Sequence, residues 1–276
     1  MRYFRFEVPD KIVNLYGLPC WHIGASQSSQ KFIDYLIGVI LRDPYAFAIY
    51  MGDGGECVTK TSKGNIYEQT LSPGDQLRVA AELLKKLGEK LKFGIRGNHG
   101  NRIDKDCGLG WDETLCARVG IPYLGVAAFG EVVLKGDGAR KNAFSLYVHH
   151  GSSGSISPAG KMSATHKPGN LVLCDVALTA HHHGCGEAWP HRMIAEVNPR
   201  TSSIEYRAMR MYACGSAYDS RDGYAEEKMY PVITPMAIVV SVSSSKGGIQ
   251  VSHSVLDGSS PEFVSDHMRQ KWTERS

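Results

Sequence analysis

The sequence has few of the features that mark a membrane, secreted or disulfide-rich protein. No apolar run approaches the roughly 20 residues that a membrane helix needs. The opening residues MRYFRFEVPDK lack the basic-then-apolar pattern of a secretory signal. The 7 cysteines are an odd number and form no CxxC pair, which argues against a disulfide framework or a zinc ribbon. These absences predict a soluble, cytoplasmic protein that has no contact with a membrane.

The charge is also nearly balanced. A formal net charge of +3 argues against a broad cationic face of the kind that coats nucleic acid, while a local basic groove stays compatible with the total. The length of 276 residues, with 42% hydrophobic and 21% charged residues, is typical of a globular protein. With no internal repeat and no evident linker, we expect a single domain over residues 1–276. Its core would cover about 11–255, followed by a polar, helical tail over 256–276.

Apolar runs and helical periodicity alternate along the first half of the chain, which is compatible with an α/β fold. Helices are expected over 29–42, 75–92 and 112–119. Residues 54–74 and 151–170 are rich in small and polar residues and predict long loops. Strands are expected at 11–16, 46–51, 127–134, 142–148, 171–179, 192–198, 203–210, 233–242 and 248–255.

Short clusters of Asp, Asn, His, Cys and Gly follow five of the apolar segments. In α/β folds, the loops at the carboxyl ends of strands are where ligand sites assemble. A single histidine or Gly-Asp pair at a strand end is usually a surface or turn residue, but five such clusters in order are a poor match to chance. The clusters are CWH at 20–22, GDGGE at 52–56, GNHG at 97–100, HHG at 149–151 and AHHHG at 180–184.

The spacing within two clusters favours metal binding. Cys20 and His22 are two residues apart, as are His181 and His183. In an extended backbone such pairs point to the same side, so each pair can offer two ligands to one site. Imidazole nitrogen together with carboxylate and amide oxygen suits zinc, manganese or iron.

The five clusters together resemble the signature of the calcineurin-like metallophosphoesterases, which is usually written DxH, GDxx(D/E/N), GNH(D/E), H and GHxH. The wording GNHGNRI at 97–103 and YEQTLSPGDQ at 67–76 is further similar to the phage and prophage branch. The resemblance implies a calcineurin-like sandwich of two mixed β-sheets flanked by α-helices, with a di-metal site at one edge. It also implies two divalent metal ions (Mn, Zn or Fe) as cofactors.

The resemblance further implies roles for individual residues. Asp53 would bridge the two metals, and His99 would stand beside the phosphate and stabilise the transition state or protonate the leaving oxygen. Glu56 would support a ligand rather than bind metal itself. The ligand set is then Cys20, His22 and His183 for the first metal, and Asn98, His181 and either His149 or His150 for the second, with a preference for His150.

The implied function is hydrolysis of a phosphoester bond by a metal-bound hydroxide. A phosphodiesterase or nuclease is the first expectation, so nucleic acid is one candidate partner. The alternatives are a small-molecule phosphomonoesterase and a non-catalytic metal-binding module with a degenerate site. Neither the native substrate nor the oligomeric state follows from the sequence.

The sequence departs from the family pattern at two positions that bear on this choice. Cys20 stands where the family has aspartate. It is a thiolate ligand of a softer site, or it marks a weakened first site, or the site is inactive. Gly100 replaces the acidic residue that usually follows GNH, and its loss would loosen the site.

Overall fold

The computed structural model describes residues 1–62, 64–136, 141–155, 157–197, 202–220, 229, 232–245 and 248–259. Within these residues no helix combines the length and the apolar character that a membrane span requires. The expected helical tail over 256–276 lies largely outside them.

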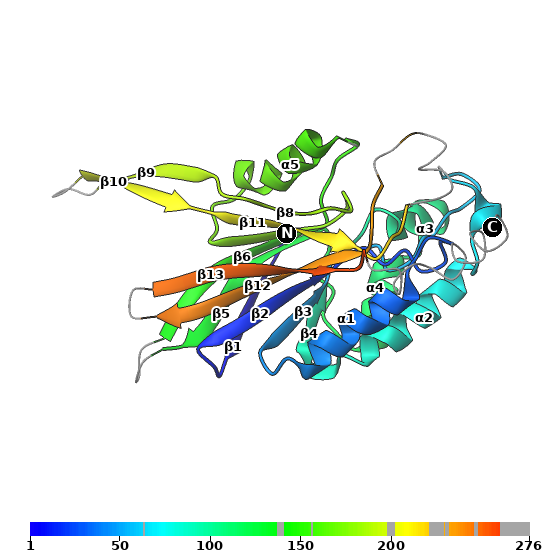
Figure 1. The fold of residues 1–276 in the computed structure, drawn as a ribbon, viewed down its shortest axis with the longest axis horizontal. Helices are drawn as coiled ribbons and strands as arrows, with labels where there is room; N and C mark the ends of the chain where they lie inside the picture. Colours follow the sequence, from blue (N-terminus) through cyan, green and yellow to red (C-terminus); the bar gives the residue numbers. More distant parts are fainter. Residues whose placement is uncertain are drawn as a thin grey trace.

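Among the described residues, eleven strands form one mixed sheet, and a two-stranded hairpin extends from it (Figure 1). The order along the sheet is β1-β5-β6-β7-β11-β12-β2-β3-β4, with β8 paired to β11 and β13 to β12, while β9 and β10 form the hairpin. The strands are β1 (Arg2–Val8), β2 (Ile12–Leu18), β3 (Ala46–Tyr50), β4 (Leu91–Gly94), β5 (Ala127–Lys135), β6 (Lys141–His149), β7 (Val176–Thr179), β8 (Cys185–Ala188), β9 (His191–Val197), β10 (Ser202–Ala208), β11 (Arg210–Ser216), β12 (Met236–Ser245) and β13 (Gly248–Asp257).

The sheet curls so that its two halves share a core. β11 and β12 join the halves through only two residue pairs, Gly215 with Ala237 and Ser216 with Met236. Fully buried apolar side chains from both halves, such as Phe144 and Leu15, belong to the same core cluster. The α/β class is therefore confirmed. The expected division into two separate sheets is not, because hydrogen bonds run from one half to the other.

Helices cover the outer face of the β2-β3-β4 half (Figure 1). α1 (Gln30–Arg42) begins at Ser29, whose side chain accepts a hydrogen bond from Phe32 N. α2 (Pro73–Lys85) begins in the same way at Ser72, with Pro73 in its first turn. α4 (Trp111–Val119) packs beside them, and their apolar faces bury a second core cluster against the strands.

Two helices lie in segments that the sequence pattern did not predict to be helical. α3 (Gly100–Cys107) directly follows the GNH cluster, and α5 (Pro158–His166) lies inside the expected loop over 151–170. Three short 3-10 helices complete the inventory of helices in the described residues: η1 (Ile66–Glu68), η2 (Gly88–Lys90) and η3 (Lys167–Asn170). β1, β4, β8 and β11 were likewise not among the expected strands. The helix expected over 75–92 ends at Lys85, because the chain turns at Gly88, where φ is +52°.

Candidate metal centre

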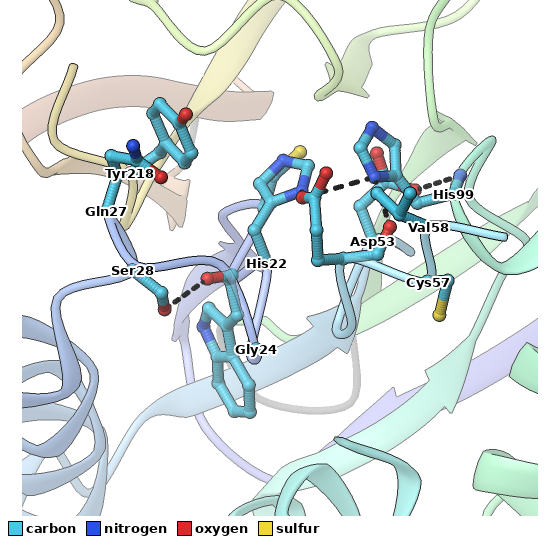
Figure 2. A network of polar contacts seen from close by, with 12 residues as sticks. His22, Gly24, Gln27, Ser28, Asp53, Cys57, Val58, His99 and Tyr218 are labelled. Atoms are coloured by element: carbon cyan, nitrogen blue, oxygen red, sulfur yellow. Dashed lines mark hydrogen bonds and ion pairs between the residues drawn. The ribbon is translucent and has the colours of Figure 1, made fainter. Parts of the chain in front are cut away.

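The five polar clusters meet at one edge of the curled sheet. β2, β3 and β4 run parallel to one another, as do β6 and β7, so the carboxyl ends of each group of strands lie together. Figure 2 shows His22, Asp53 and His99 brought side by side from three separate loops. The sequence therefore places the clusters at strand ends, and the topology brings them into contact.

The backbone at this edge is strained. Four of the expected site residues have a positive φ: His22 at 50°, Asp53 at 54°, His181 at 73° and His183 at 54°. Such values are uncommon outside glycine and cost roughly 1–3 kcal/mol each, so they persist where the surrounding structure enforces them and often mark functional sites. The loops also cross very closely, because a Cβ added at Gly52 would lie 2.4 Å from the backbone nitrogen of Gly97.

Asp53 is at the centre of the cluster and is 1% exposed. Its Oδ1 accepts a hydrogen bond from the backbone N–H of His99 at 2.8 Å. Its Oδ2 is buried and has no hydrogen-bond partner among the described residues, although His150 Nε2 lies 3.0 Å away. Burial favours the neutral acid, but His150, His99 and His22 hold the pKa of Asp53 well below its ordinary value. A buried, ionised oxygen that faces an imidazole nitrogen, here the Nε2 of His150, is an environment in which a cation would be bound.

His22 and His183 face each other with their ring nitrogens. His22 Nδ1 lies 2.9 Å from Glu56 Oε2, and this contact turns the other ring nitrogen, Nε2, toward His183. That Nε2 lies 2.9 Å from His183 Nε2. Burial and the neighbouring His22 lower the pKa of His183 well below its ordinary value, so its ring is neutral. Glu56 therefore orients His22, as carboxylates commonly do for metal-binding histidines.

His150 and His181 converge in the same way on Asn98. The Nδ1 of His150 lies 2.7 Å from the carbonyl of Met51, and the Nε2 of His181 lies 3.0 Å from the carbonyl of Ser153. Burial lowers the pKa of His150, but Asp53 outweighs it and raises the pKa above its ordinary value, whereas burial lowers the pKa of His181. Once a bound cation displaces the ring proton, the nitrogen of each ring that does not face a carbonyl carries a lone pair. Those nitrogens lie 2.9 and 2.7 Å from Asn98 Oδ1, an acceptor oxygen. The two ring nitrogens and Asn98 Oδ1 would then all be acceptors that face one another, an arrangement that a cation bound between them would stabilise.

His149 is the expected candidate that the structure places outside the cluster. Its Nδ1 accepts a hydrogen bond from the backbone N–H of Gly151 at 2.7 Å, and its ring stacks near Tyr147. Successive side chains of a strand point to opposite faces, so His149 and His150 do not reach the same site. The geometry therefore supports His150 as the ligand.

Cys20 is fully buried within the cluster. Burial and the neighbouring Asp53 raise the pKa of its thiol well above the ordinary value, so it binds as a thiolate only where a cation displaces the proton. In the part of the chain that the structure describes, three groups of side chains have ligand atoms within 4.8 Å of one another: Cys20 with His22 and His183, Cys20 with Asp53 and His150, and His22 with Asp53 and His99. These residues fit a metal ion.

His99 makes contacts that differ from those of the other histidines. Its Nδ1 lies 2.8 Å from the carbonyl of Glu56, and Arg102 Nη2 lies 3.1 Å from its Nε2. Burial lowers the pKa of His99, but the carboxylates of Asp53 and Glu56 outweigh it and raise the pKa above its ordinary value. Arg102 and a proton therefore compete for the same nitrogen. Arg102, on α3, was not predicted as a site residue although it lies within the GNHGNRI stretch, because the helix that turns its side chain back toward His99 was not expected.

Asp112 is a second residue that the motif pattern did not identify. It is 2% exposed on α4, and its carboxylate accepts hydrogen bonds from Tyr50 Oη at 2.6 Å and from Gly97 N at 3.1 Å. A Cβ at Gly100 would lie 2.3 Å from its Oδ2. Burial raises the pKa of Asp112 to about 6. Gly100 lacks the carboxylate that usually follows GNH in the family pattern. The carboxylate of Asp112, from the neighbouring α4, lies beside that position instead.

Gly100→Ala is expected to destabilise the protein by about 1–3 kcal/mol, because the new methyl group would overlap the Asp112 carboxylate. Denaturant unfolding would measure the loss, and Gly74→Ala is the matched control, because its Cβ would meet no atom closer than 3.9 Å. The loss should shrink in the Asp112→Ala background, since the overlapping group is gone. An equal loss in both backgrounds would contradict this explanation.

Comparisons with known proteins place the chain only loosely. No protein-family model matches the chain, and the comparison with curated proteins gives no match either. Among solved structures, the chain is similar to a single mutant of Vps29 from Entamoeba histolytica, at 12% identity and a TM-score of 0.33, over 89% of this chain and 99% of that one. It is also similar to vacuolar protein sorting 29 from Cryptosporidium parvum, at 12% identity and a TM-score of 0.33, over 90% and 100% of the two chains. Values this low assign no family and no activity, so the chemistry of the site rests on its own contacts.

Proposed function

We propose that this protein hydrolyses phosphoester bonds with the help of two divalent metal ions (Mn, Zn or Fe). The observation that carries the proposal is the buried, ionised Asp53, whose Oδ2 has no donor in the described residues and lies between two sets of inward-facing ligand atoms. The motif series resembles that of the calcineurin-like metallophosphoesterases and supports the same chemistry.

The ligands divide into two sets that share Asp53. In this proposal one ion is held by Cys20, His22 and His183, and the other by Asn98, His150 and His181. Two divalent cations at these positions would withdraw charge from a phosphoryl oxygen and lower the pKa of a water molecule. The carboxylate of Glu56 and the carbonyls behind His150 and His181 keep the rings aligned before any substrate arrives.

His99 is the group proposed to handle the proton. Its backbone N–H is fixed on Asp53, which sets the ring at the edge of the metal centre. The raised pKa lets its ring carry a proton near neutral pH, and Nε2 faces away from the Glu56 carbonyl. When the ring gives that proton to the leaving oxygen, Arg102 can donate to the freed nitrogen and hold the neutral tautomer.

The test is hydrolysis of bis-p-nitrophenyl phosphate by protein loaded with manganese. His99→Ala is expected to lower kcat by about 10²-fold while metal content stays unchanged, because the residue moves a proton and binds no ion. His166→Ala, an exposed histidine on α5, is the matched control and should keep full activity. Unchanged turnover in His99→Ala would remove that residue from the mechanism.

A non-catalytic metal-binding module is the second candidate, and Cys20 is the observation that favours it. A thiolate in place of a carboxylate makes a softer site that suits a structural zinc ion. Full metal content together with no hydrolysis of bis-p-nitrophenyl phosphate would support this candidate and contradict the first.

A further inference from the structure

A cavity of about 500 Å³ adjoins the metal centre. Pockets of this size commonly take a small organic molecule. The lining residues come from the loop after β2, the segment between β3 and α2, α3 and the end of β11. Those used below are Gln27, Glu56, Asn65, Glu68, Arg102 and Tyr218.

The inner wall of the cavity is made by residues that also contact the centre. The Tyr218 ring packs 5.7 Å from the ring of His22 and 5.8 Å from that of His183. Figure 2 shows Tyr218 and Gln27 on one side of His22, with Asp53 and His99 on the other. A group attached to a phosphorus atom at the centre can therefore extend directly into the cavity.

The outer wall is held in place by side-chain hydrogen bonds. Gln69 both accepts from Val58 N and donates to Val58 O, each at 2.9 Å, and its Oε1 also accepts from Gln76 Nε2 at 2.9 Å. Gln76 is fully buried on α2, so it ties this wall to the core. The described part of the segment expected to be a loop over 54–74 thus forms a fixed wall, which limits the size of what can enter.

The polar groups of the cavity favour a ligand with N–H donors and without a further phosphate. Glu68 accepts one hydrogen bond from Asn65 at 3.1 Å and keeps acceptor capacity on an exposed carboxylate. Arg102, the cation among the described lining residues, is already engaged by Glu56 and His99. Burial, Glu56 and Glu68 raise the pKa of the Tyr218 hydroxyl, as expected where carboxylates face it. The Tyr218 ring adds a surface on which a planar group can pack.

We propose that this cavity is the subsite for the leaving group, and that it takes a nucleoside that carries no second phosphate. The inference rests on the proposed function and names its substrate class: small nucleoside phosphoesters rather than polynucleotides. In the reaction, water supplies the new P–O bond and the bond from phosphorus to the nucleoside oxygen breaks. His99 gives its proton to that nucleoside oxygen. Of the two protons of the attacking water, one stays on the released hydrogen phosphate and the other returns to His99 through solvent, so atoms and charges balance.

The test compares cytidine 5′-monophosphate with cytidine 3′,5′-bisphosphate, because the exocyclic amine of cytosine pairs with carboxylates. Release of the 5′-phosphate is followed by chromatography. The wild type should show a kcat/KM at least about tenfold higher for the monophosphate, since the second phosphate would approach Glu68. Glu68→Gln should reduce this preference at least about threefold, while Glu82→Gln, an exposed site on α2, should keep it.

Equal kcat/KM for the two nucleotides, or an unchanged preference in Glu68→Gln, would overturn the proposal. So would turnover of bis-p-nitrophenyl phosphate without turnover of cytidine 5′-monophosphate. If no phosphoester is hydrolysed, the proposed function fails. Isothermal titration calorimetry with cytidine alone then tests whether the cavity binds a nucleoside. Binding that weakens in Glu68→Gln would support the nucleoside subsite, and no binding to the wild type would overturn it.

Discussion

Asp53→Asn is expected to remove metal from both positions and to lower the hydrolysis of bis-p-nitrophenyl phosphate by roughly 10⁴-fold or more. The substitution keeps the shape of the side chain and replaces the ionised oxygen that both ligand sets share. Asparagine also tolerates the positive φ of this position, which is 54°, whereas alanine would add backbone strain. The loss should therefore come from the missing charge rather than from a distorted loop.

Elemental analysis after dialysis measures the result directly. The wild type should retain about two ions per chain, and Asp53→Asn close to none. Asp34→Asn is the matched control, because Asp34 is exposed on α1 and should not change metal content. Full occupancy in Asp53→Asn would show that Asp53 is not shared by two ions.

Cys20→Ser is expected to weaken zinc binding at the first position by roughly three orders of magnitude, while the second position stays filled. A serine hydroxyl is a poor zinc ligand, and Cys20 is fully buried beside His22 and His183. Cys20→Asp should restore binding and favour manganese, since it exchanges a soft ligand for a hard one.

Cobalt substitution gives a readout that does not depend on activity. A thiolate bound to cobalt produces a charge-transfer band in the near ultraviolet, which wild type should show and Cys20→Ser should lose. Cys107→Ser, at the exposed cysteine, should keep the band. A band that survives in Cys20→Ser would mean that another cysteine binds the metal or that the first position lies elsewhere.

The sequence predicted those parts of the fold that are encoded locally. The helix expected over 29–42 is α1 (Gln30–Arg42), because its apolar spacing and its capping residue Ser29 lie within one short segment. The strands before four of the five clusters, β2, β3, β6 and β7, were found for the same reason, since each lies in a short apolar run. The polar clusters could be read as one site because they recur in order along the chain after such runs.

Contacts between distant segments were not predictable in this way. β1 pairs with β5, so that Arg2 lies opposite Ala128, and nothing near the amino terminus indicates that partner. Asp112 replaces a carboxylate only because α4 packs beside Gly100. α5 had a local signal that was overlooked, since Ser157 followed by Pro158 is a common helix start.

The narrow join between the two halves of the sheet has a mechanical consequence. The halves are linked by two residue pairs of β11 and β12, supported by a bridge between Cys20 and Ser216. Cys20, His22, Asp53 and Asn98 come from one half, whereas His150, His181 and His183 come from the other. Ions held by both sets would cross-link the two halves. Removal of the ions by a chelator should therefore destabilise the contact between β11 and β12 before it destabilises the core of either half. The rate of amide hydrogen exchange at Gly215 and Ala237 would measure this local stability.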